Sequence, residues 1–393
     1  MNAGEAFNRE AATTRVKRLL PLLDEQAAEM DRRRELTPEV HRALVDADLL
    51  RLLMPRAIGG QEIDLLEFCD ACDLAARADA STGWFIAQCN VTSSTAAAAL
   101  ARDVALEMFD GPTAGAAWGP PHGASRAVRV EGGYRLTGQW SYASGGRHTK
   151  WLGAHSAVQN PDGTPYMRHG RPDHRTFLFL RTEAKIIDDW HVLGMRATGS
   201  DSYSVSDLFV PESRAPLRDA PEERRENGPI YVVGSVALYA VGFASVTMGN
   251  AQRLLDDLIE LTRGRSSKAS TSALARNNSV QQEIATLDHR LAAARALLRK
   301  ATGEAYEAAE RNALGLDCRM RLRLATTLAM KEATDVAVAC YRAAGTNAIR
   351  ANFPFERRLR DALTASQHIQ GSPLLVEMVG RHIVGTDNVV TLV

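Results

Sequence analysis

The segment from residue 227 to 252 contains no charged side chain and constrains the fold more than any other part of the sequence. An uncharged stretch of this length is long enough to cross a bilayer as a helix. Its glycines Gly234, Gly242 and Gly249 are spaced by eight and seven residues, which places them on one helical face. Several Ser, Thr and Tyr residues interrupt its apolar character. We therefore expect a close-packed helix buried in a bundle, with a membrane span as the alternative.

Length and charge exclude several classes of protein. The chain has 393 residues, a length typical of two or three domains. Its 47 Lys and Arg balance its 47 Asp and Glu, whereas nucleic acids and anionic membranes attract proteins with a basic excess. With 45% hydrophobic and 24% charged residues, the composition is globular rather than disordered. We therefore expect a large buried core and no nucleic-acid or membrane partner.

The five cysteines, an odd number spread over the chain, do not form a disulfide framework. This usage fits a reducing cytoplasm, and the N-terminal residues lack the apolar stretch of a secretory signal. Cys69 and Cys72 form a CxxC pair in a stretch of helical periodicity, LLEFCDACDLAARA. Two thiols on one buried helical face explain the pair, with redox chemistry or metal binding as the alternative. No second Cys/His pair has ligand spacing, so we expect no metal site.

The composition changes along the chain and predicts three domains. Residues 1–112 are rich in Ala, Leu, Glu and Arg and predict an N-terminal α-helical domain, in which Thr37 and Pro38 begin a helix. Residues 113–212 alternate β-branched and aromatic residues with turn signals and predict a central antiparallel β domain. Residues 213–393 contain long amphipathic stretches and predict a C-terminal helical bundle. The expected fold class is mainly α with a central antiparallel β domain.

Five strings, in order and spread from end to end of the chain, resemble the acyl-CoA dehydrogenase superfamily. They are LTPEVHRALVDADLLRLLMPRAIGGQ, ADASTGW, GGYRLTGQWSYASGGRHTKW, DDWHVLGMRATGSDSYSVSDLFVP and AAGTNAIRANFPFERRLRDALTASQHIQGSP. The resemblance implies the acyl-CoA dehydrogenase-like fold, with an α-helical domain, a β domain and a C-terminal helical bundle. It also implies a flavin held between the β domain and the bundle.

Three features are similar to the oxygenase branch of this superfamily: STGW, the WxxxSG of Trp140–Gly145, and GMRATGS. This branch contains the oxygenase components of two-component flavin-dependent monooxygenases, among them phenol and indole hydroxylases and dibenzothiophene monooxygenase. The resemblance implies reduced flavin (FADH2 or FMNH2) from a separate NAD(P)H flavin reductase, with O2 as co-substrate. It implies hydroxylation of an aromatic substrate through a C4a-hydroperoxyflavin. N- or S-oxygenation by the same branch is an alternative.

One position separates dehydrogenase from oxygenase chemistry. An acyl-CoA dehydrogenase needs a carboxylate base over the flavin, and many members carry it near the C-terminus in an RDA…YEGT string. In this chain the corresponding position is Gln370, whose amide cannot accept that proton. Some relatives place the glutamate on an earlier helix, so an acyl-CoA dehydrogenase stays an alternative. A flavin-free relative that only binds a small ligand is a further alternative.

Ser144 and His368 are the catalytic residues that the resemblance implies. Ser144 falls where the oxygenases hold a serine hydroxyl close to flavin N5, and His368 falls where they hold a histidine over the flavin. An imidazole, with an unperturbed pKa of about 6.5, suits proton exchange near neutral pH. His368 could deprotonate a substrate O–H or N–H, or hydrogen-bond the distal peroxide oxygen. An ordinary β-turn serine and a structural histidine are the alternative interpretations.

Two departures from the phenol hydroxylases weaken the case for a phenol. Such enzymes often carry a further histidine in the STGW helix, whereas residues 84–92 here contain none. Some also have a histidine where this chain has Leu363. A flatter neutral aromatic such as an indole, or a substrate oxidised at nitrogen or sulfur, fits these departures better.

The resemblance further implies residues that hold the flavin ring. Trp118 and Trp140 flank the expected ring site, with a place in the β core as the alternative. Thr198 and Ser200 offer hydroxyl and amide donors on a tight turn, with a plain loop as the alternative. No GxGxxG motif follows a strand, so no nicotinamide site is expected and the electrons must come from another protein.

A second group of residues is expected at the flavin phosphate. Arg263, with Arg265 beside it, ends a bundle helix where relatives place a phosphate-binding arginine, and a guanidinium fits phosphate well. Ala344 and Gly345 match a small-residue turn that approaches the cofactor, often from a neighbouring subunit. Together with the uncharged glycine-lined helix, this turn predicts a homotetramer or a homodimer.

Overall fold

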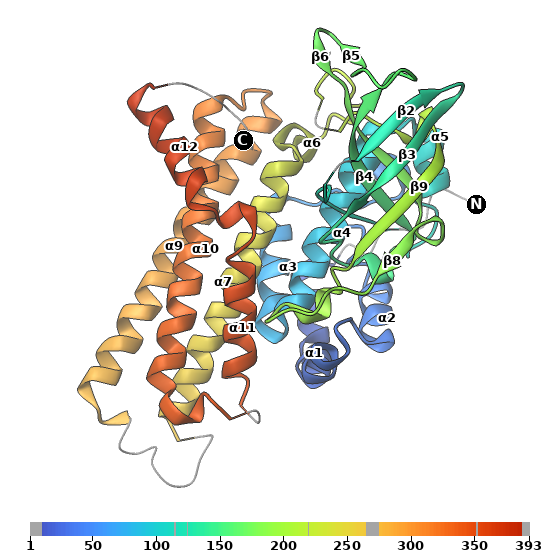
Figure 1. Cartoon of the computed structure of the whole chain (residues 1–393). Helices are drawn as coiled ribbons and strands as arrows, with labels where there is room; N and C mark the ends of the chain where they lie inside the picture. The colour runs from blue at the N-terminus through green and yellow to red at the C-terminus, as the bar shows by residue number, and fades with distance from the viewer. Residues whose placement is uncertain are drawn as a thin grey trace.

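A computed structural model describes residues 10–386 except 114, 124, 219, 265–274 and 351–352. Helices form the N-terminal part of the chain, a twisted sheet follows, and long helices complete it (Figure 1). The N-terminal helices are α1 (Ala12–Arg33), α2 (Pro38–Asp46), α3 (Leu65–Ala78), α4 (Ala80–Ala99) and α5 (Arg102–Met108). The predicted order of helices, sheet and helices is therefore confirmed.

The helix predicted from Thr37 and Pro38 begins where expected. The Thr37 hydroxyl accepts a hydrogen bond from the Val40 N–H at 3.4 Å, and Pro38 occupies the first helical position. A hydroxyl cap satisfies one of the N–H groups that a helix start leaves without a partner, and proline suits the first turn. The short α2 helix therefore begins with a satisfied cap, and it packs on the longer α1.

Helix α4 is enclosed on all sides. Every residue from Ala80 to Ala98 is buried, so the helix has no solvent face. Its polar side chains are satisfied internally: the Asn90 amide donates to the Leu49 carbonyl at 2.8 Å, and the Thr92 hydroxyl donates to the Ala116 carbonyl. Such pairing is required because a buried polar group without a partner is costly. The helix can therefore pack against the sheet and the bundle at once.

The β domain is one seven-stranded sheet with a small separate hairpin. The strands are β1 (Ala116–Gly119), β2 (Arg126–Val130), β3 (Gly133–Trp140), β4 (Trp151–Gln159), β7 (His174–Leu180), β8 (Lys185–Ile187) and β9 (Ser202–Pro211), with the hairpin β5 (Met167–Arg168) and β6 (Arg171–Pro172). The order is β1-β4-β2-β3-β9-β8, with β7 also paired to β4. The predicted turn between β2 and β3 is confirmed at Gly132, which has a φ of +74°.

The sheet is mixed rather than wholly antiparallel. Antiparallel pairing holds for β2–β3, β3–β9, β4–β7 and β8–β9, as predicted. However, β4 pairs parallel with both β1 and β2. The connection after β3 carries the chain across the sheet, so that one edge of β4 pairs with β1 and β2, which run in its own direction, while its other edge pairs with antiparallel β7. Strand direction depends on such a crossing and not on the alternation within each strand.

The C-terminal part is a helical bundle whose central helix is the uncharged segment. Its helices are α6 (Pro229–Val233), α7 (Ser235–Thr262), α9 (Asn278–Glu310), α10 (Leu316–Ala344), α11 (Phe355–Ala365) and α12 (Pro373–Val384). In Figure 1, α7 runs between α3 and α10. No helix among the described residues is apolar over a length sufficient to cross a membrane. The expectation of a buried bundle helix is therefore confirmed.

Two of the three glycines act as the sequence predicts. A Cβ at Gly249 would lie 2.1 Å from the Asp73 carbonyl oxygen on α3, and one at Gly242 would lie 3.2 Å from the Ala87 Cβ on α4. The missing side chains allow the helices to approach closely. Gly234 does not share this face, contrary to the prediction, because its φ of +89° places it between α6 and α7.

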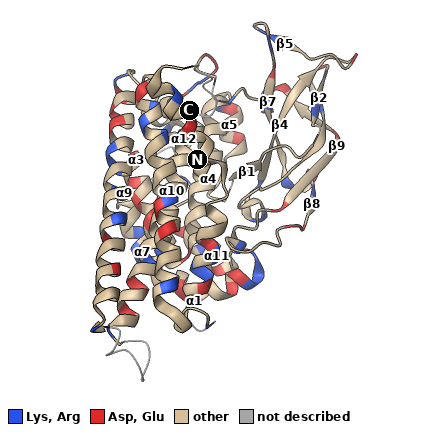
Figure 2. Ribbon diagram, turned by 60° about the vertical axis from the view of Figure 1, so that its left-hand side comes forward, with Lys and Arg blue, Asp and Glu red and all other residues tan. Residues whose placement is uncertain are grey.

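Charges of both signs are interspersed over the outer helices. Figure 2 shows both basic and acidic residues along α3, α9 and α10. Ion pairs within and between helices use many of these groups, such as Arg290 with Glu332 at 2.8 Å.

Candidate active site

Three hydroxyl groups form a short hydrogen-bonded chain where two loops of the β domain meet. Ser144 follows β3, and its Oγ lies 2.7 Å from the Oγ of Ser200. The Ser200 Oγ lies 2.6 Å from the Thr198 Oγ1, and the Thr198 hydroxyl donates to the Met195 carbonyl at 2.8 Å. The structure therefore brings together three of the predicted site residues.

Thr198 sets the donor and acceptor roles along this row of three hydroxyl groups. The only proton of the Thr198 hydroxyl goes to the Met195 carbonyl, so Thr198 accepts from Ser200. Ser200 then accepts from Ser144, whose own proton is used in that bond. The half-buried Ser144 Oγ is consequently left with lone pairs and suits an N–H donor.

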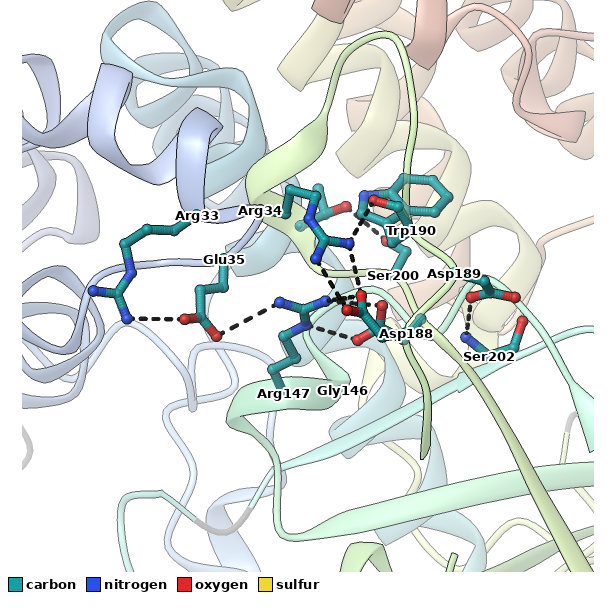
Figure 3. A network of polar contacts seen from close by, with 12 residues as sticks. Arg33, Arg34, Glu35, Gly146, Arg147, Asp188, Asp189, Trp190, Ser200 and Ser202 are labelled. Carbon is teal, nitrogen blue, oxygen red and sulfur yellow. Dashed lines mark hydrogen bonds and ion pairs between the residues drawn. The ribbon is translucent and has the colours of Figure 1, made fainter. Parts of the chain in front are cut away.

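Arg147 anchors the turn that carries Ser200. Its Nε and Nη2 donate to the two carboxylate oxygens of Asp201 at 2.6 and 2.9 Å, and Nη2 also donates to Asp188 at 3.2 Å. Arg34 forms a bidentate pair with the same Asp188 at 2.6 and 3.1 Å (Figure 3). This network ties the turn to the connection between α1 and α2, since Arg34 lies in that connection.

Two glycines let these loops approach their neighbours. Gly199 has a φ of +52°, and a Cβ there would lie 2.9 Å from the Cδ of Arg147. Gly145 has a φ of +78°, and a Cβ there would lie 2.8 Å from the ring of Phe85 on α4. A side chain at either position would be strained and would displace the turn. The Ser144–Gly145 turn is therefore packed directly on α4.

His368 lies at the end of α11 against an aromatic wall. Its ring meets Phe243 edge-on, with centroids 4.7 Å apart, and meets Trp84 edge-on at 5.3 Å. Trp84 and Phe243 stack on each other at 3.7 Å, which joins α4 to α7. Burial lowers the pKa of His368 to about 4, so the imidazole is neutral near pH 7.

A backbone hydrogen bond selects the tautomer of this imidazole. The Gln370 N–H donates to the Nδ1 of His368 at 3.2 Å. A neutral ring that accepts at Nδ1 carries its proton on Nε2. The Nε2–H of His368 is therefore a hydrogen-bond donor rather than a free base. Of the two roles expected from the sequence, this geometry favours donation over proton abstraction.

Gln370 is engaged in hydrogen bonds within the bundle and cannot act as a base. Its side-chain oxygen accepts a hydrogen bond from Arg323, and its backbone carbonyl accepts from the Thr327 hydroxyl at 3.2 Å. Helix α7, which packs on His368 through Phe243, has no acid before Asp256. The alternative of a glutamate on an earlier helix therefore finds no support on α4, which contains no acid, or on α7 ahead of Asp256.

Ser144 and His368 both lie next to the N-terminal half of α4. The turn that follows Ser144 packs on Phe85, and His368 packs on Trp84, the preceding residue of the same helix. Consecutive helical residues point about 100° apart, so the Ser144–Gly145 turn and His368 contact neighbouring faces of α4. This is the structural relation between the two predicted catalytic residues.

The two predicted tryptophans lie in the β domain core. Trp140 is fully buried, stacks on Tyr203 at 5.7 Å, and donates from Nε1 to the His155 carbonyl at 2.9 Å. Trp118 is also buried, with its ring edge-on to His155 at 5.4 Å. These positions match the alternative of a core role, and contact with a flavin stays a prediction for both.

The residues predicted at the flavin phosphate lie at another end of the bundle. Arg263 caps the C-terminus of α7 and is exposed, while Ala344 and Gly345 end α10. Figure 1 shows both helix ends at the bottom of the bundle, below the end of α11 that leads to His368. They are therefore not brought together with Ser144 and His368 within one chain, and Arg265 lies outside the described residues.

Sequence reasoning did not identify the groups that position the site. Arg147, Asp201 and Asp361 all lie inside the strings that were singled out, but their partners are distant in sequence. His148, which the sequence did not single out, is largely buried and stacks on His41 at 4.8 Å, and burial lowers its pKa to about 4. The only sequence signal for these residues is that they are polar or charged and lie within the strings that resemble the superfamily.

These groups fit a reduced flavin. Reduced isoalloxazine carries a hydrogen on N5, and the orientation of the hydroxyl chain leaves Ser144 Oγ as an acceptor for such a donor. A neutral histidine, buried against the stacked rings of Trp84 and Phe243, packs on the same helix α4 as the Ser144–Gly145 turn. The donor set of the site thus matches the cofactor that the sequence predicted.

Family models of acyl-CoA dehydrogenases match two parts of the chain, which together exceed half of its length. The model of the N-terminal domain matches residues 7–103, and that of the C-terminal domain matches residues 241–373. Together with the helical domain, the sheet and the bundle, they define the class. The chain belongs to the acyl-CoA dehydrogenase superfamily. Within it, the chain belongs to the branch of two-component flavin-dependent monooxygenases, as its relatives indicate.

Those relatives are named as oxygenases or form complexes with reduced flavin, and each aligns with most of this chain. Indole-3-acetate monooxygenase of Pseudomonas putida is 28% identical over 86% of this chain and 85% of its own length. The flavin-dependent monooxygenase oxygenase subunit HsaA of Rhodococcus jostii is 27% identical over 91% and 94%. The structure of XiaF from Streptomyces sp. in complex with FADH2 and glycerol is 27% identical, with a TM-score of 0.86 over 97% and 96%.

Proposed function

We propose that this chain hydroxylates a small aromatic molecule with O2 and with reduced flavin supplied by a separate NAD(P)H flavin reductase. The observation that carries this proposal is the pair His368 and Gln370. A neutral histidine faces the aromatic wall, while the position of the dehydrogenase base is an amide bound to Arg323. The relatives named as monooxygenases support the same class of reaction.

The chain contributes hydrogen bonds and exclusion of water, while the flavin, when bound, supplies the activation of O2. The lone pairs of Ser144 Oγ would hold the N5–H of the reduced ring. The Nε2–H of His368 would donate to the oxygen atom that is transferred or to its leaving partner. Trp84 and Phe243 place apolar surface next to His368, which would limit access of water to the reacting oxygen and so limit its loss as hydrogen peroxide.

The proposed substrate is a phenol- or indole-type aromatic, with an indole favoured over a phenol. Near His368 the structure shows Trp84 and Phe243, which offer flat apolar faces rather than a second histidine. Relatives named for indole-3-acetate, p-hydroxyphenylacetate and resorcinol support an aromatic ring as the reacting group. Oxygenation at nitrogen or sulfur remains the second candidate within the same site.

Mass spectrometry of reaction products tests the proposed activity. The protein is mixed with FMN or FAD, NADH and a flavin reductase, and indole or indole-3-acetate is added. We expect a product that is heavier by one oxygen atom and that requires both the reductase and O2. Tightly bound FAD that is bleached anaerobically by an acyl-CoA would instead establish a dehydrogenase. Absence of any effect of flavin on the melting temperature would favour the flavin-free alternative.

We also propose a homotetramer or homodimer. Helix α12 exposes apolar side chains that a neighbouring copy would cover, with Leu374 and Ile383 each 72% exposed. Arg263 and Gly345 lie apart from His368 within one chain, which fits a flavin whose phosphate meets a second subunit. Light scattering after size exclusion tests this proposal, and a monomer at micromolar concentration would reject it.

The cytoplasm is the proposed location. All five cysteines are free, and burial raises the pKa of the thiols of Cys69 and Cys89 to about 12 and about 11. Such thiols are poorly reactive and suit a reducing compartment. Fractionation of the native cells tests this prediction, and recovery of the protein from an oxidising compartment would contradict it.

A further inference from the structure

The short turn after His368 is held by a neighbouring helix of the bundle. It is the single-turn helix η7 (Ile369–Gly371), which connects α11 to α12. Arg323 on α10 donates to the side-chain oxygen of Gln370. The Thr327 hydroxyl, one turn further along α10, donates to the Gln370 carbonyl at 3.2 Å. Helix α10 therefore binds both the side chain and the backbone of one residue of this turn.

Gly371 brings the same turn close to α10. A Cβ at this position would lie 3.3 Å from the Cε of Met330, which is tighter than an ordinary contact. Positions 323, 327 and 330 are separated by four and three residues, so they lie on one face of α10. One helical face thus provides the side-chain, backbone and packing contacts that fix η7.

A charged group at position 323 is unfavourable for stability by itself. Arg323 is 3% exposed, and it lines the same small space as Ala237 and Ala240 of α7. Burial lowers the pKa of Arg323 to about 10, so the guanidinium still carries its charge near pH 7. Withdrawing a cation from water is costly, and an apolar side chain of similar size is often equally or more stable. Stability alone therefore does not explain an arginine here.

The residue that Arg323 binds controls the imidazole of His368. The Gln370 N–H donates to His368 Nδ1 at 3.2 Å, and this bond leaves the ring proton on Nε2. The N–H, the carbonyl and the side-chain amide all belong to Gln370. A rotation of the turn that broke the contacts with α10 would therefore also move the N–H away from the ring.

The helices that pack on His368 present few ionisable groups within the described part of the chain. Helix α4 contains no Asp, Glu, Lys, Arg or His. Helix α7 contributes Phe243 and the Tyr239 phenol, which stack at 5.7 Å in its uncharged half. On α11 the preceding acid, Asp361, accepts from a backbone N–H of the β domain. The cation linked to the ring through hydrogen bonds is Arg323, by way of Gln370.

We propose that Arg323 is a positioning residue, which holds Gln370 so that its N–H keeps the proton of His368 on Nε2. Arg323 acts through the turn and not by contact with the imidazole. A turn released from α10 would leave Nδ1 free to take up a proton and would expose the ring to water. The proposal rests on the proposed function only for the task of His368. The protonation state of the ring can be measured without turnover.

Nitrogen NMR spectra of the full-length protein, labelled in its histidine rings, test the proposal. His368→Ala identifies the signals of His368. In the wild-type protein we expect a neutral ring with its proton on Nε2 from pH 5 to pH 8, since burial lowers the pKa of His368 to about 4. In Arg323→Met we expect both tautomers and a pKa of about 6, close to the unperturbed value. Arg323→Lys, which keeps a charged donor, should give an intermediate pKa.

The pH dependence of coupling gives a second readout. A protonated imidazole is an acid that can transfer its proton to the bound oxygen and release it as hydrogen peroxide. We expect the share of peroxide in Arg323→Met to rise about fivefold or more from pH 8 to pH 5, as His368 takes up a proton. In the wild-type protein this share should stay constant. A merely structural role of Arg323 would raise it equally at every pH.

A double variant shows whether Arg323 acts through Gln370. Gln370→Met removes the oxygen that Arg323 binds and keeps the backbone N–H. Combined with Arg323→Met, it should shift the pKa of His368 no further than either single variant does. Thr327→Val removes the second contact and should cause a smaller shift in the same direction. If the melting temperature shows that Arg323→Met is unfolded, an unchanged pKa in Thr327→Val would overturn the proposal.

Arg358→Gln is the matched control, because Arg358 is also a buried arginine of the bundle. It is 2% exposed, donates to the Arg77 carbonyl and pairs with Asp257. Its loss should lower the melting temperature and leave the pKa and tautomer of His368 unchanged. An equal shift in Arg358→Gln and Arg323→Met, or an unchanged His368 ring in Arg323→Met, would overturn the proposal.

The two readouts separate this proposal from the proposed function. A His368 ring that depends on Arg323, in a protein that yields no oxygenated product, would retain the positioning role and reject the oxygenase. Coupled product formation with a His368 ring that does not respond to Arg323→Met would retain the oxygenase and reject the positioning role.

Discussion

Asp361 accepts a hydrogen bond from the backbone N–H of Met195 at 2.6 Å, and both residues are buried. The bond joins α11, which leads to His368, to the loop that carries Thr198 and Ser200. Met195 has a φ of +53°, so its N–H is directed by an uncommon backbone conformation. One carboxyl group therefore couples the two predicted catalytic parts of the site.

The pH dependence of stability should report on Asp361. Burial raises its pKa to about 7, with the charge of Asp79 adding to the effect. The folded chain therefore holds a proton that the unfolded chain releases above its ordinary pKa of about 4, and stability from this group falls as pH rises from about 4 to about 7. Asp361→Asn removes that dependence and keeps an acceptor oxygen. We expect the melting temperature of Asp361→Asn, relative to wild type, to rise between pH 5 and pH 8.

Asp361→Ala is the contrasting variant, because it leaves the buried Met195 N–H without its acceptor. At pH 5, where folded Asp361 holds its proton, it should lower the free energy of unfolding by about 1–3 kcal/mol. This deficit should shrink toward pH 8, because the variant has no carboxyl group to titrate. A constant difference in melting temperature between Asp361→Asn and wild type from pH 5 to pH 8 would show that Asp361 does not titrate in this range.

His368→Ala should abolish coupled oxygenation. The variant loses the Nε2–H donor next to Trp84, so we expect product formation to fall about 100-fold or more while flavin oxidation releases hydrogen peroxide. The Kd of reduced flavin should not change. Product and peroxide are measured in the same reaction. His289→Ala, an exposed histidine on α9, is the control, and equal coupling in the two variants would remove His368 from the mechanism.

Ser144→Ala tests the acceptor at the end of the hydroxyl chain. Loss of one hydrogen bond is worth about 1 kcal/mol, so the Kd of reduced flavin should rise about five- to tenfold. Anaerobic titration with dithionite-reduced flavin measures it. Ser141→Ala is a matched control, because Ser141 accepts from the Ser202 hydroxyl at 2.9 Å and is not part of the chain. A larger effect of Ser141→Ala would contradict the assignment.

Gln370→Glu restores the carboxylate of the dehydrogenases and should still fail as a base. The new carboxylate would pair with Arg323, which donates to the present amide. The bond from the residue 370 N–H to His368 Nδ1 is unaffected, so oxygenation should persist. Anaerobic addition of an acyl-CoA should leave the flavin oxidised. Bleaching in this variant would show that position 370 faces the flavin.

Arg263→Ala should weaken flavin binding without unfolding the chain. Arg263 is exposed at the C-terminus of α7, so its removal costs little stability, whereas a charged contact to phosphate is worth about 1.5–3 kcal/mol. We expect the Kd of reduced flavin to rise about tenfold or more. Arg311→Ala is the matched control at the C-terminus of α9. An unchanged Kd for Arg263→Ala would reject the phosphate role.

The fold could be predicted from the sequence because helical and alternating periodicities are local. The uncharged segment, the cap at Thr37 and the turn at Gly132 each depend on residues within a few positions. The parallel pairing of β4 could not be predicted in this way, because it depends on where the chain crosses the sheet. Gly234 was misplaced for a similar reason, since spacing alone does not show that a helix is broken.

Site residues could be predicted where they lie in one of the strings that resemble the superfamily, and could not where their hydrogen-bond partners lie far away in the sequence. Thr198 and Ser200 are two residues apart, and Ser144 lies in the WxxxSG string that is similar to the oxygenase branch. In contrast, the partner of Arg323 is Gln370, on a different element of the bundle. No periodicity links such distant residues, so these contacts require the three-dimensional structure.

The complete enclosure of α4 sets a limit on how this helix can vary. An ordinary surface helix tolerates replacements on its outer side and therefore shows a tolerance that recurs every turn. Residues 80–98 have no outer side. A saturation library over this stretch should consequently show uniform intolerance, with no recurrence at 3.6 residues, and attempts to redesign specificity from α4 would require compensating changes in the sheet and in α7.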